Sequence, residues 1–189
     1  MRYLILSLLI ILSACTNSSK TTISVDMYNS SGDMVGTAKL SEHKDGVQIK
    51  LTLEGLEPGF HGVHVHEYAK CEGSDFKSAG NHFDPEGKEH GLMHPDGPHL
   101  GDLPNIEADS GGLVDAELML ADATLLDGKK SLLKKDGTSL IITERQDDGV
   151  SQPGGDSGAR IICGEIKEDS ENKESPTDPT EFNEEQEES

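Results

Sequence analysis

The sequence has little positive charge, no internal repeat and no helical periodicity after its first residues. Lys and Arg number 16 against 36 Asp and Glu, which gives a formal net charge of −20. A chain this acidic is repelled by phosphate backbones, which argues against nucleic acid as a partner. The missing repeat and the length of the central part favour one domain with a single core. The missing 3.6-residue period argues against a helical fold.

Long apolar runs are also absent, apart from one at the N-terminus. There the run "YLILSLLIILSA" follows Arg2, is too short to span a bilayer comfortably, and ends in small residues. It predicts a signal peptide over residues 1–14. The run closes on "LSAC", which resembles the lipobox of bacterial lipoproteins, with Cys15 as the lipidated first residue of the mature chain. The alternative is an ordinary signal peptide followed by a coincidental cysteine.

The segment after Cys15 is polar and reads as a flexible tether over residues 15–22. Together these features predict an extracytoplasmic protein that is lipid-anchored to a bacterial cell membrane. Of the three cysteines, lipidation of Cys15 leaves one pair, Cys71 and Cys163. Outside the cytoplasm such thiols can persist as a disulfide.

The C-terminus is an acidic segment of low hydrophobicity. From Lys167 to Ser189 it holds ten acidic residues, two lysines and one aromatic residue. It has too little apolar surface to offset the entropy of ordering, which predicts a disordered tail over residues 168–189. The folded domain is therefore expected over residues 23–167.

The domain itself reads as all-β. Several short segments alternate in polarity or are rich in β-branched residues, and turn signals such as "SGD" and "KDG" separate the early ones. Two longer connections, residues 68–106 and 145–158, interrupt this rhythm, and loops of that length are usually functional or disordered. The strand segments begin at Thr21, Met34, Val47, Gly62, Leu113, Ser139 and Ala159.

Histidines concentrate where the first long connection begins. Seven of the eight lie between His61 and His99. In "HGVHVHE", side chains two residues apart share a face of a strand, so His64 and His66 project together while His61 points the other way. Imidazole suits zinc and copper, and a carboxylate can complete a zinc site. Further candidates of these types follow at His82, His90, His99 and Asp102.

From about Val25 to Ile166 these residues resemble the copper/zinc superoxide dismutases. "GVHVHE" is similar to the first copper segment of that family, which implies that His64 and His66 are copper ligands. "AGNHFDP" matches the bridging position, so the resemblance implies that His82 is shared between copper and zinc. The spacing that follows matches the remaining zinc ligands of the family, namely His90, His99 and Asp102.

The resemblance extends to four other positions. Cys71 and Cys163 fall where the family has its intrasubunit disulfide, and Arg160 matches the arginine that guides and holds superoxide beside copper. Asp147 matches the aspartate that links copper-side and zinc-side histidines. The implied fold is an eight-stranded Greek-key β-barrel, an immunoglobulin-like sandwich, with long metal-binding and electrostatic loops.

One position departs from the family pattern. A fourth copper histidine is expected four residues ahead of Asp147, where this sequence has Thr143, and a hydroxyl is a poor copper ligand. Another side chain is not expected to replace this missing copper ligand, because His61 has the wrong strand parity and His43 is remote in sequence. Met93 and His94 belong to the zinc-loop segment. The segment from Glu144 to Arg160 also has a local charge balance of minus 2, with two arginines against four acids. Four lysines could offset this negative charge only if they face the channel that leads to the copper site. They are Lys129, Lys130, Lys134 and Lys135.

Three functions remain open from the sequence. The first is a superoxide dismutase-like envelope lipoprotein that retains zinc and binds copper in a weakened site, so that turnover is reduced. The alternative is a zinc-containing, non-catalytic protein that holds copper or zinc. A third is a zinc-stabilised scaffold. Arg160 and Asp147 favour the enzyme, and Thr143 favours the binding protein; the oligomeric state stays open.

Overall fold

The computed structural model describes residues 21–168, so the predictions for residues 1–20, including Cys15, and for residues 169–189 lie outside the described residues. The described part is all-β, apart from the three-residue 3₁₀ helix η1 (Lys77–Ala79). No helix within residues 21–168 is long and apolar enough to cross a membrane. The strands are β1 (Thr22–Asn29), β2 (Met34–His43), β3 (Gly46–Leu53), β4 (Gly59–His61), β5 (Val63–His66), β6 (Ile106–Ala108), β7 (Val114–Ala121), β8 (Thr138–Thr143) and β9 (Arg160–Ile166).

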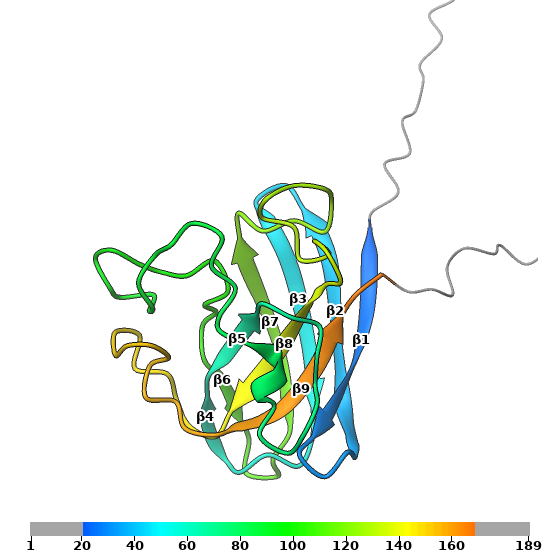
Figure 1. Ribbon diagram of the computed structural model, residues 1–189. Coiled ribbons are helices and arrows are strands. Elements are labelled where there is room, and N and C mark those ends of the chain that lie inside the picture. The colour runs from blue at the N-terminus through cyan, green and yellow to red at the C-terminus, as the bar shows by residue number, and fades with distance from the viewer. Residues whose placement is uncertain (1–20, 169–189) are drawn as a thin grey trace, which may run out of the picture.

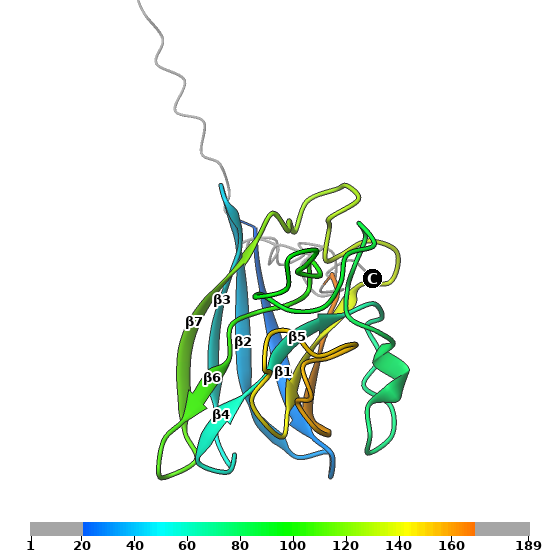
Figure 2. The same cartoon turned by 90° about the vertical axis from the view of Figure 1, so that its left-hand side faces the viewer.

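These strands curl into a Greek-key barrel (Figures 1 and 2). Seven of them form one antiparallel sheet in the order β5-β8-β9-β1-β2-β3-β7, and β4 pairs with β6. Only Gly62 separates β4 from β5, so this pair acts as one bent strand that leads from the large sheet into the small one. Counted in this way the barrel has the eight strands predicted. The short strands β4 and β6, with three residues each, were not predicted separately.

Alternation of side chains builds the core. On β1 the buried residues Ile23, Val25 and Met27 alternate with exposed ones, as in a strand with one face in water. On β8, by contrast, all six residues are buried. The inner face, with Leu140 and Ile142, joins the main core. The outer face is therefore covered by the long loops.

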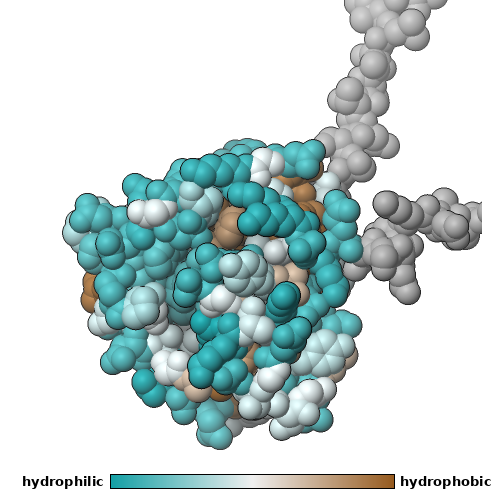
Figure 3. All heavy atoms as spheres, in the orientation of Figure 1, coloured by the Kyte–Doolittle hydropathy of each residue, from teal (hydrophilic) through white to brown (hydrophobic). Residues whose placement is uncertain are grey.

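The covered outer face is where the candidate site lies. In the antiparallel register, His64 of β5 is opposite Ile141 of β8, and His66 is opposite Ser139. Residues directly opposite each other project to the same side of a sheet. Figure 1 shows the second long loop and the later part of the first beside β4, β5 and β6, outside the barrel, while the part of the first loop with η1 lies over β8 and β9. The surface in this view is mostly hydrophilic, with small apolar patches (Figure 3).

A disulfide ties the first loop to the barrel. Cys71 and Cys163 are bonded, with their Cα atoms 5.8 Å apart and 92 residues between them in sequence. Cys163 is fully buried on β9 and packs in a small cluster with Phe76, Ala79 and Ile141. The bond therefore holds the segment that contains η1 against the outer face of the sheet.

Removal of this bond is expected to lower stability. A crosslink that closes a loop of this length removes entropy from the unfolded chain, an effect of about 4 kcal/mol in the chain-entropy model. We expect Cys71→Ser to melt well below the wild type in calorimetry without reductant. Cys15→Ser is the matched control and leaves the melting temperature unchanged. Equal melting temperatures of wild type and Cys71→Ser would contradict the prediction.

Candidate metal centre

Two buried carboxylates organise the histidine cluster. Asp102 Oδ1 lies 2.8 Å from His82 Nδ1 and 3.4 Å from His99 Nδ1, and Asp102 Oδ2 lies 3.2 Å from His90 Nδ1. The Nδ1 atoms of three imidazoles thus converge on one carboxylate. Three nitrogens and one carboxylate oxygen form a donor set that tetrahedral zinc prefers. The structure brings together the four residues predicted to hold zinc.

The second carboxylate, that of Asp147, connects a histidine of β5 with a histidine of the first long loop. Asp147 Oδ2 lies 2.6 Å from His64 Nε2 and 3.1 Å from His90 Nε2. The backbone N–H of Gly149 also donates to its Oδ1, and the side chain of Asn105 pairs with its backbone N–H and carbonyl at 2.9 Å each. Sequence reasoning predicted Asp147 in this linking position but missed Asn105.

The residues predicted to bind copper lie directly beside this cluster. The rings of His64 and His82 stack with centroids 4.1 Å apart, and the ring of His66 is 4.8 Å from that of His82. His66 Nδ1 donates to the carbonyl of Gly80 at 3.0 Å, which fixes its tautomer. Ligand atoms that all lie within 4.8 Å of one another are provided by His64, His82, His90 and Asp102. This group includes members of both predicted sets, because the two sets adjoin.

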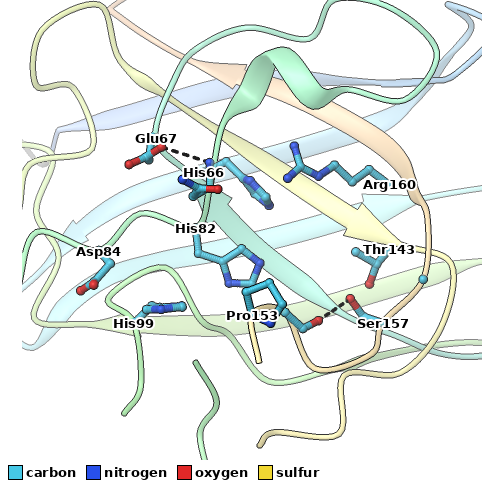
Figure 4. Close-up of a pocket in the computed structure, with 12 residues that line it drawn as sticks. His66, Glu67, His82, Asp84, His99, Thr143, Pro153, Ser157 and Arg160 are labelled. Carbon is cyan, nitrogen blue, oxygen red and sulfur yellow. Dashed lines mark hydrogen bonds between the residues drawn. The ribbon is translucent and has the colours of Figure 1, made fainter. Parts of the chain in front are cut away.

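A pocket of about 570 Å³ opens beside His66 and His82. Figure 4 shows His66, His82, Thr143 and Arg160 around it. The Arg160 guanidinium donates to the carbonyls of Phe76 and Gly80 at 2.9 and 2.8 Å, so it is held in the pocket wall. The carbonyl of Gly80 therefore positions both His66 and Arg160, a role that no residue type in the sequence reveals.

The other histidines stay outside the cluster, as the sequence predicted. His61 is buried, but its ring nitrogens each lie 2.8 Å from a backbone carbonyl, those of Thr143 and Glu57. His94 Nδ1 accepts the N–H of Asp96 and does not line the pocket. Met93 is 69% exposed.

The four lysines that could offset the acidic loop only by facing the channel do not line this pocket. Lys134 and Lys135 line a neighbouring cavity that shares Glu67 and Asp84 with it, and Lys130 pairs with Glu86 at 3.2 Å. Arg160 is the only lysine or arginine among the residues that line the pocket in the described part of the chain. The pocket lining also includes two acids, Glu67 and Asp84.

Comparison with known proteins places this arrangement in a family. The family model for copper/zinc superoxide dismutase (SODC) matches residues 34–166. The chain belongs to the copper/zinc superoxide dismutase family. It is 44% identical over 144 residues to superoxide dismutase [Cu-Zn] 2 of Aquifex aeolicus, which covers 75% of this chain and 84% of that protein. It is 41% identical over 145 residues to a superoxide dismutase-like protein of Bacillus subtilis, with 75% and 74% covered.

A solved structure agrees in fold. It is a double mutant of a superoxide dismutase-like protein from Bacillus subtilis, in which a tyrosine and a proline were each replaced by histidine. The TM-score is 0.75 at 42% identity, with 77% of this chain and 97% of that chain covered. The Greek-key barrel of this chain is thus the superoxide dismutase fold.

Buried ring nitrogens without partners fit the metals of this family. Among the described residues, His64 Nδ1, His66 Nε2, His90 Nδ1 and His99 Nδ1 are buried and make no hydrogen bond. A buried polar atom without a partner is costly, so a group of them in one place indicates an ion. In His64 the other ring nitrogen contacts Asp147, and in His66 the other ring nitrogen contacts the carbonyl of Gly80. In His90 and His99 the unpartnered Nδ1 faces Asp102. The residues present therefore fit copper and zinc.

Burial and neighbouring charges shift the pKa of two histidines downward. Burial, together with the charges of His82 and Arg160, lowers the pKa of His66 to about 2. Burial also lowers the pKa of His82 to about 4, although its hydrogen bond to Asp102 opposes this. Both imidazoles are therefore neutral at physiological pH, which is the form that binds a metal ion.

His90 behaves in the opposite way. Burial alone would lower its pKa, but the carboxylates of Asp102 and Asp147, which lie 3.2 and 3.1 Å from its two ring nitrogens, outweigh burial and raise the pKa of His90 to about 9. Burial likewise opposes ionisation of the two carboxyls, yet the close contacts with the histidines hold the pKa of Asp102 and of Asp147 well below the usual range. In the metal-free protein His90 is therefore a cation at pH 7 that lies between two anions.

Zinc uptake is expected to depend on pH for this reason. A zinc ligand must be deprotonated, so zinc bound at the predicted ligand His90 would displace a proton from it below about pH 9. We expect the apparent zinc affinity of the metal-free protein to rise about tenfold per pH unit from pH 7 to about pH 9 and to flatten above it. Chelator competition across this range measures the slope, and an affinity independent of pH between 7 and 8.5 would contradict it.

Proposed function

We propose that the protein is an envelope lipoprotein that dismutates superoxide to oxygen and hydrogen peroxide at a copper/zinc site, with reduced turnover because of Thr143. The observation that carries the proposal is the set of unpartnered nitrogens of His64 and His66 beside a pocket that Arg160 lines. Bound copper would supply the one-electron oxidation and reduction of superoxide. The steps below concern what the side chains of this chain contribute.

His82 is suited to be shared by the two metals. Its Nδ1 faces Asp102 at 2.8 Å, on the side predicted to hold zinc. Its Nε2 makes no hydrogen bond with a described residue and lies beside Gly154, which lines the pocket. Under the proposal His64, His66 and His82 hold copper, and His82, His90, His99 and Asp102 hold zinc.

Asp147 and Gly80 orient the rings for this purpose. Asp147 accepts the Nε2–H of His64 and leaves Nδ1 as a free ligand atom, and the carbonyl of Gly80 does the same for His66 through its Nδ1–H. Such partners fix the ring orientation and raise the basicity of the ligand nitrogen. Metal ions therefore need little rearrangement of the rings.

Arg160 supplies the positive charge for an anionic substrate. Two of its N–H groups are used by the carbonyls of Phe76 and Gly80, and the remaining donors stay available in the pocket. A fixed guanidinium beside His66 can hold superoxide by charge and hydrogen bonding. Because Glu67 and Asp84 line the same pocket, this attraction acts at short range.

Thr143 is the reason to expect reduced turnover in this proposal. Its side chain lines the pocket, and its hydroxyl donates to the carbonyl of Arg145 at 3.2 Å. A hydroxyl that is already hydrogen-bonded is a poor ligand for copper, which prefers imidazole and soft donors. Three histidines would then hold copper, so its affinity is weaker than with a fourth imidazole.

The second candidate is a non-catalytic protein that contains zinc and holds copper or zinc. Thr143 favours it, and the Bacillus subtilis relative is itself named only superoxide dismutase-like. We also propose that the chain is exported and anchored to a bacterial membrane through lipid on Cys15, on the strength of the "LSAC" motif. The substrate would then meet the site outside the cytoplasm.

Superoxide decay separates the two candidates. The protein without residues 1–15 is loaded with zinc and copper, its metal content is quantified, and superoxide decay is followed by pulse radiolysis. We expect decay in proportion to bound copper and slower per copper than in a dismutase with four copper histidines. No decay above buffer with copper bound would reject the enzyme and favour the binding protein.

A single substitution tests the role of Thr143. We expect Thr143→His to raise copper affinity at least tenfold, which corresponds to about 1.4 kcal/mol of binding free energy. We also expect it to raise the rate of superoxide decay per copper. Thr37→His on β2 is the control, because this strand does not contribute to the pocket. If Thr143→His binds copper fully but the decay rate stays at the wild-type value, Thr143 is not the cause of reduced turnover.

A further inference from the structure

The predicted zinc ligand His90 is held through its backbone as well as its ring. The backbone N–H of His90 donates to Gln152 Oε1 at 3.0 Å, and Gln152 Nε2 donates to the carbonyl of His90 at 3.0 Å. The side-chain amide thus pairs with this peptide as a neighbouring strand would. Gln152 Nε2 also donates to the carbonyl of Val150 at 3.1 Å, within its own loop. The amide therefore joins the loop of Asp147 to the segment of His90.

Close backbone contact surrounds this pairing. Gly91 has a φ of +110°, and a Cβ there would collide with the carbonyl oxygen of Gly149. The N–H of Met93 donates to the same oxygen at 3.1 Å. The loop of Asp147 therefore contacts the segment of His90 at three points. These are Asp147 on the ring of His90, the carbonyl of Gly149, and the side chain of Gln152. Of these three residues, Gln152 is the nearest in sequence to Pro153 and Gly154, which line the pocket.

The residues after Gln152 form part of the pocket wall. Pro153 and Gly154 both line the pocket beside His82, and a Cβ at Gly154 would lie 3.6 Å from His82 Nε2 (Figure 4). One short stretch, residues 152–154, thus touches His90 at its start and the free side of His82 at its end. The position of His90 and the shape of the pocket are connected through this stretch.

We propose that Gln152 is a positioning residue that couples the zinc side of the site to the copper side. Its amide fixes the peptide of His90 and, in the same turn, the wall of the pocket beside His82. Zinc bound at His90 then orders the wall and raises copper affinity, and by linkage bound copper slows zinc release. This inference rests on the metal-binding function proposed above.

Two variants and one matched control test the proposal. Gln152→Leu removes all hydrogen bonds of the amide. Gln152→Glu has the same shape but lacks the donors for the carbonyls of His90 and Val150. Gln146→Leu is the control, because Gln146 is an exposed glutamine of the same loop and makes no hydrogen bond with a described residue. Circular dichroism and melting curves verify that each variant is folded.

The readouts are metal affinities rather than activity. For each protein we measure the zinc dissociation rate with a chromogenic chelator, and the copper affinity with and without bound zinc by chelator competition. We expect both Gln152 variants to release zinc about tenfold faster, because Gln152→Leu loses three neutral hydrogen bonds and Gln152→Glu loses two. We also expect the zinc-dependent gain in copper affinity to fall about tenfold, while Gln146→Leu behaves as the wild type.

Each result decides one question. A Gln152→Glu protein with wild-type zinc release and wild-type coupling would mean that only the shape of the side chain matters, and the proposal would be wrong. Faster zinc release with unchanged coupling would also overturn it, because it would show a local structural role. If the wild type binds neither metal, the proposed function fails instead, so the two failures are distinguishable.

Discussion

The burial of two carboxylates, Asp102 and Asp147, is the constraint on which the site depends. A buried charge is tolerated only when hydrogen bonds and opposite charges surround it. Asp102 accepts the N–H groups of Gly91 and His99, and Asp147 accepts that of Gly149, so both acids fold the loops around themselves. The imidazoles supply the remaining partners. A cation, as a protonated histidine or as metal ions, is what keeps two such anions close together.

The same arrangement explains why a glycine stands at position 80. Its carbonyl receives both the ring of His66 and the guanidinium of Arg160, which requires φ of +80° and a close approach to Tyr68. A Cβ there would lie 2.7 Å from the Tyr68 ring. Any other side chain would displace this carbonyl, and with it the orientation of His66, a predicted metal ligand, and of Arg160.

Side-chain patterns predicted the frame of the site, and backbone contacts supplied the rest. The two-residue period placed His64 and His66 on one face and excluded His61, as the structure confirms. It could not indicate that β8 is buried on both faces, because the covering loops are irregular. The roles of Asn105, Gly80 and Gln152 were missed because each acts on or through a peptide group, and peptide groups are the same at every position. The three-residue strands β4 and β6 were missed because so short a segment shows no period.

At Thr143 the main chain and the side chain have separate roles. Its backbone N–H donates to Gly62 and its carbonyl meets the ring of His61, so its main chain joins the bent strand β4–β5 to β8 whatever its side chain is. Only the side chain faces the pocket. The predicted zinc ligands lack this freedom, because removing one leaves a buried carboxylate short of a partner and loosens a loop. The side chain at this position of β8 can therefore change with little effect on the frame, while the predicted zinc ligands are maintained by the stability of the fold itself.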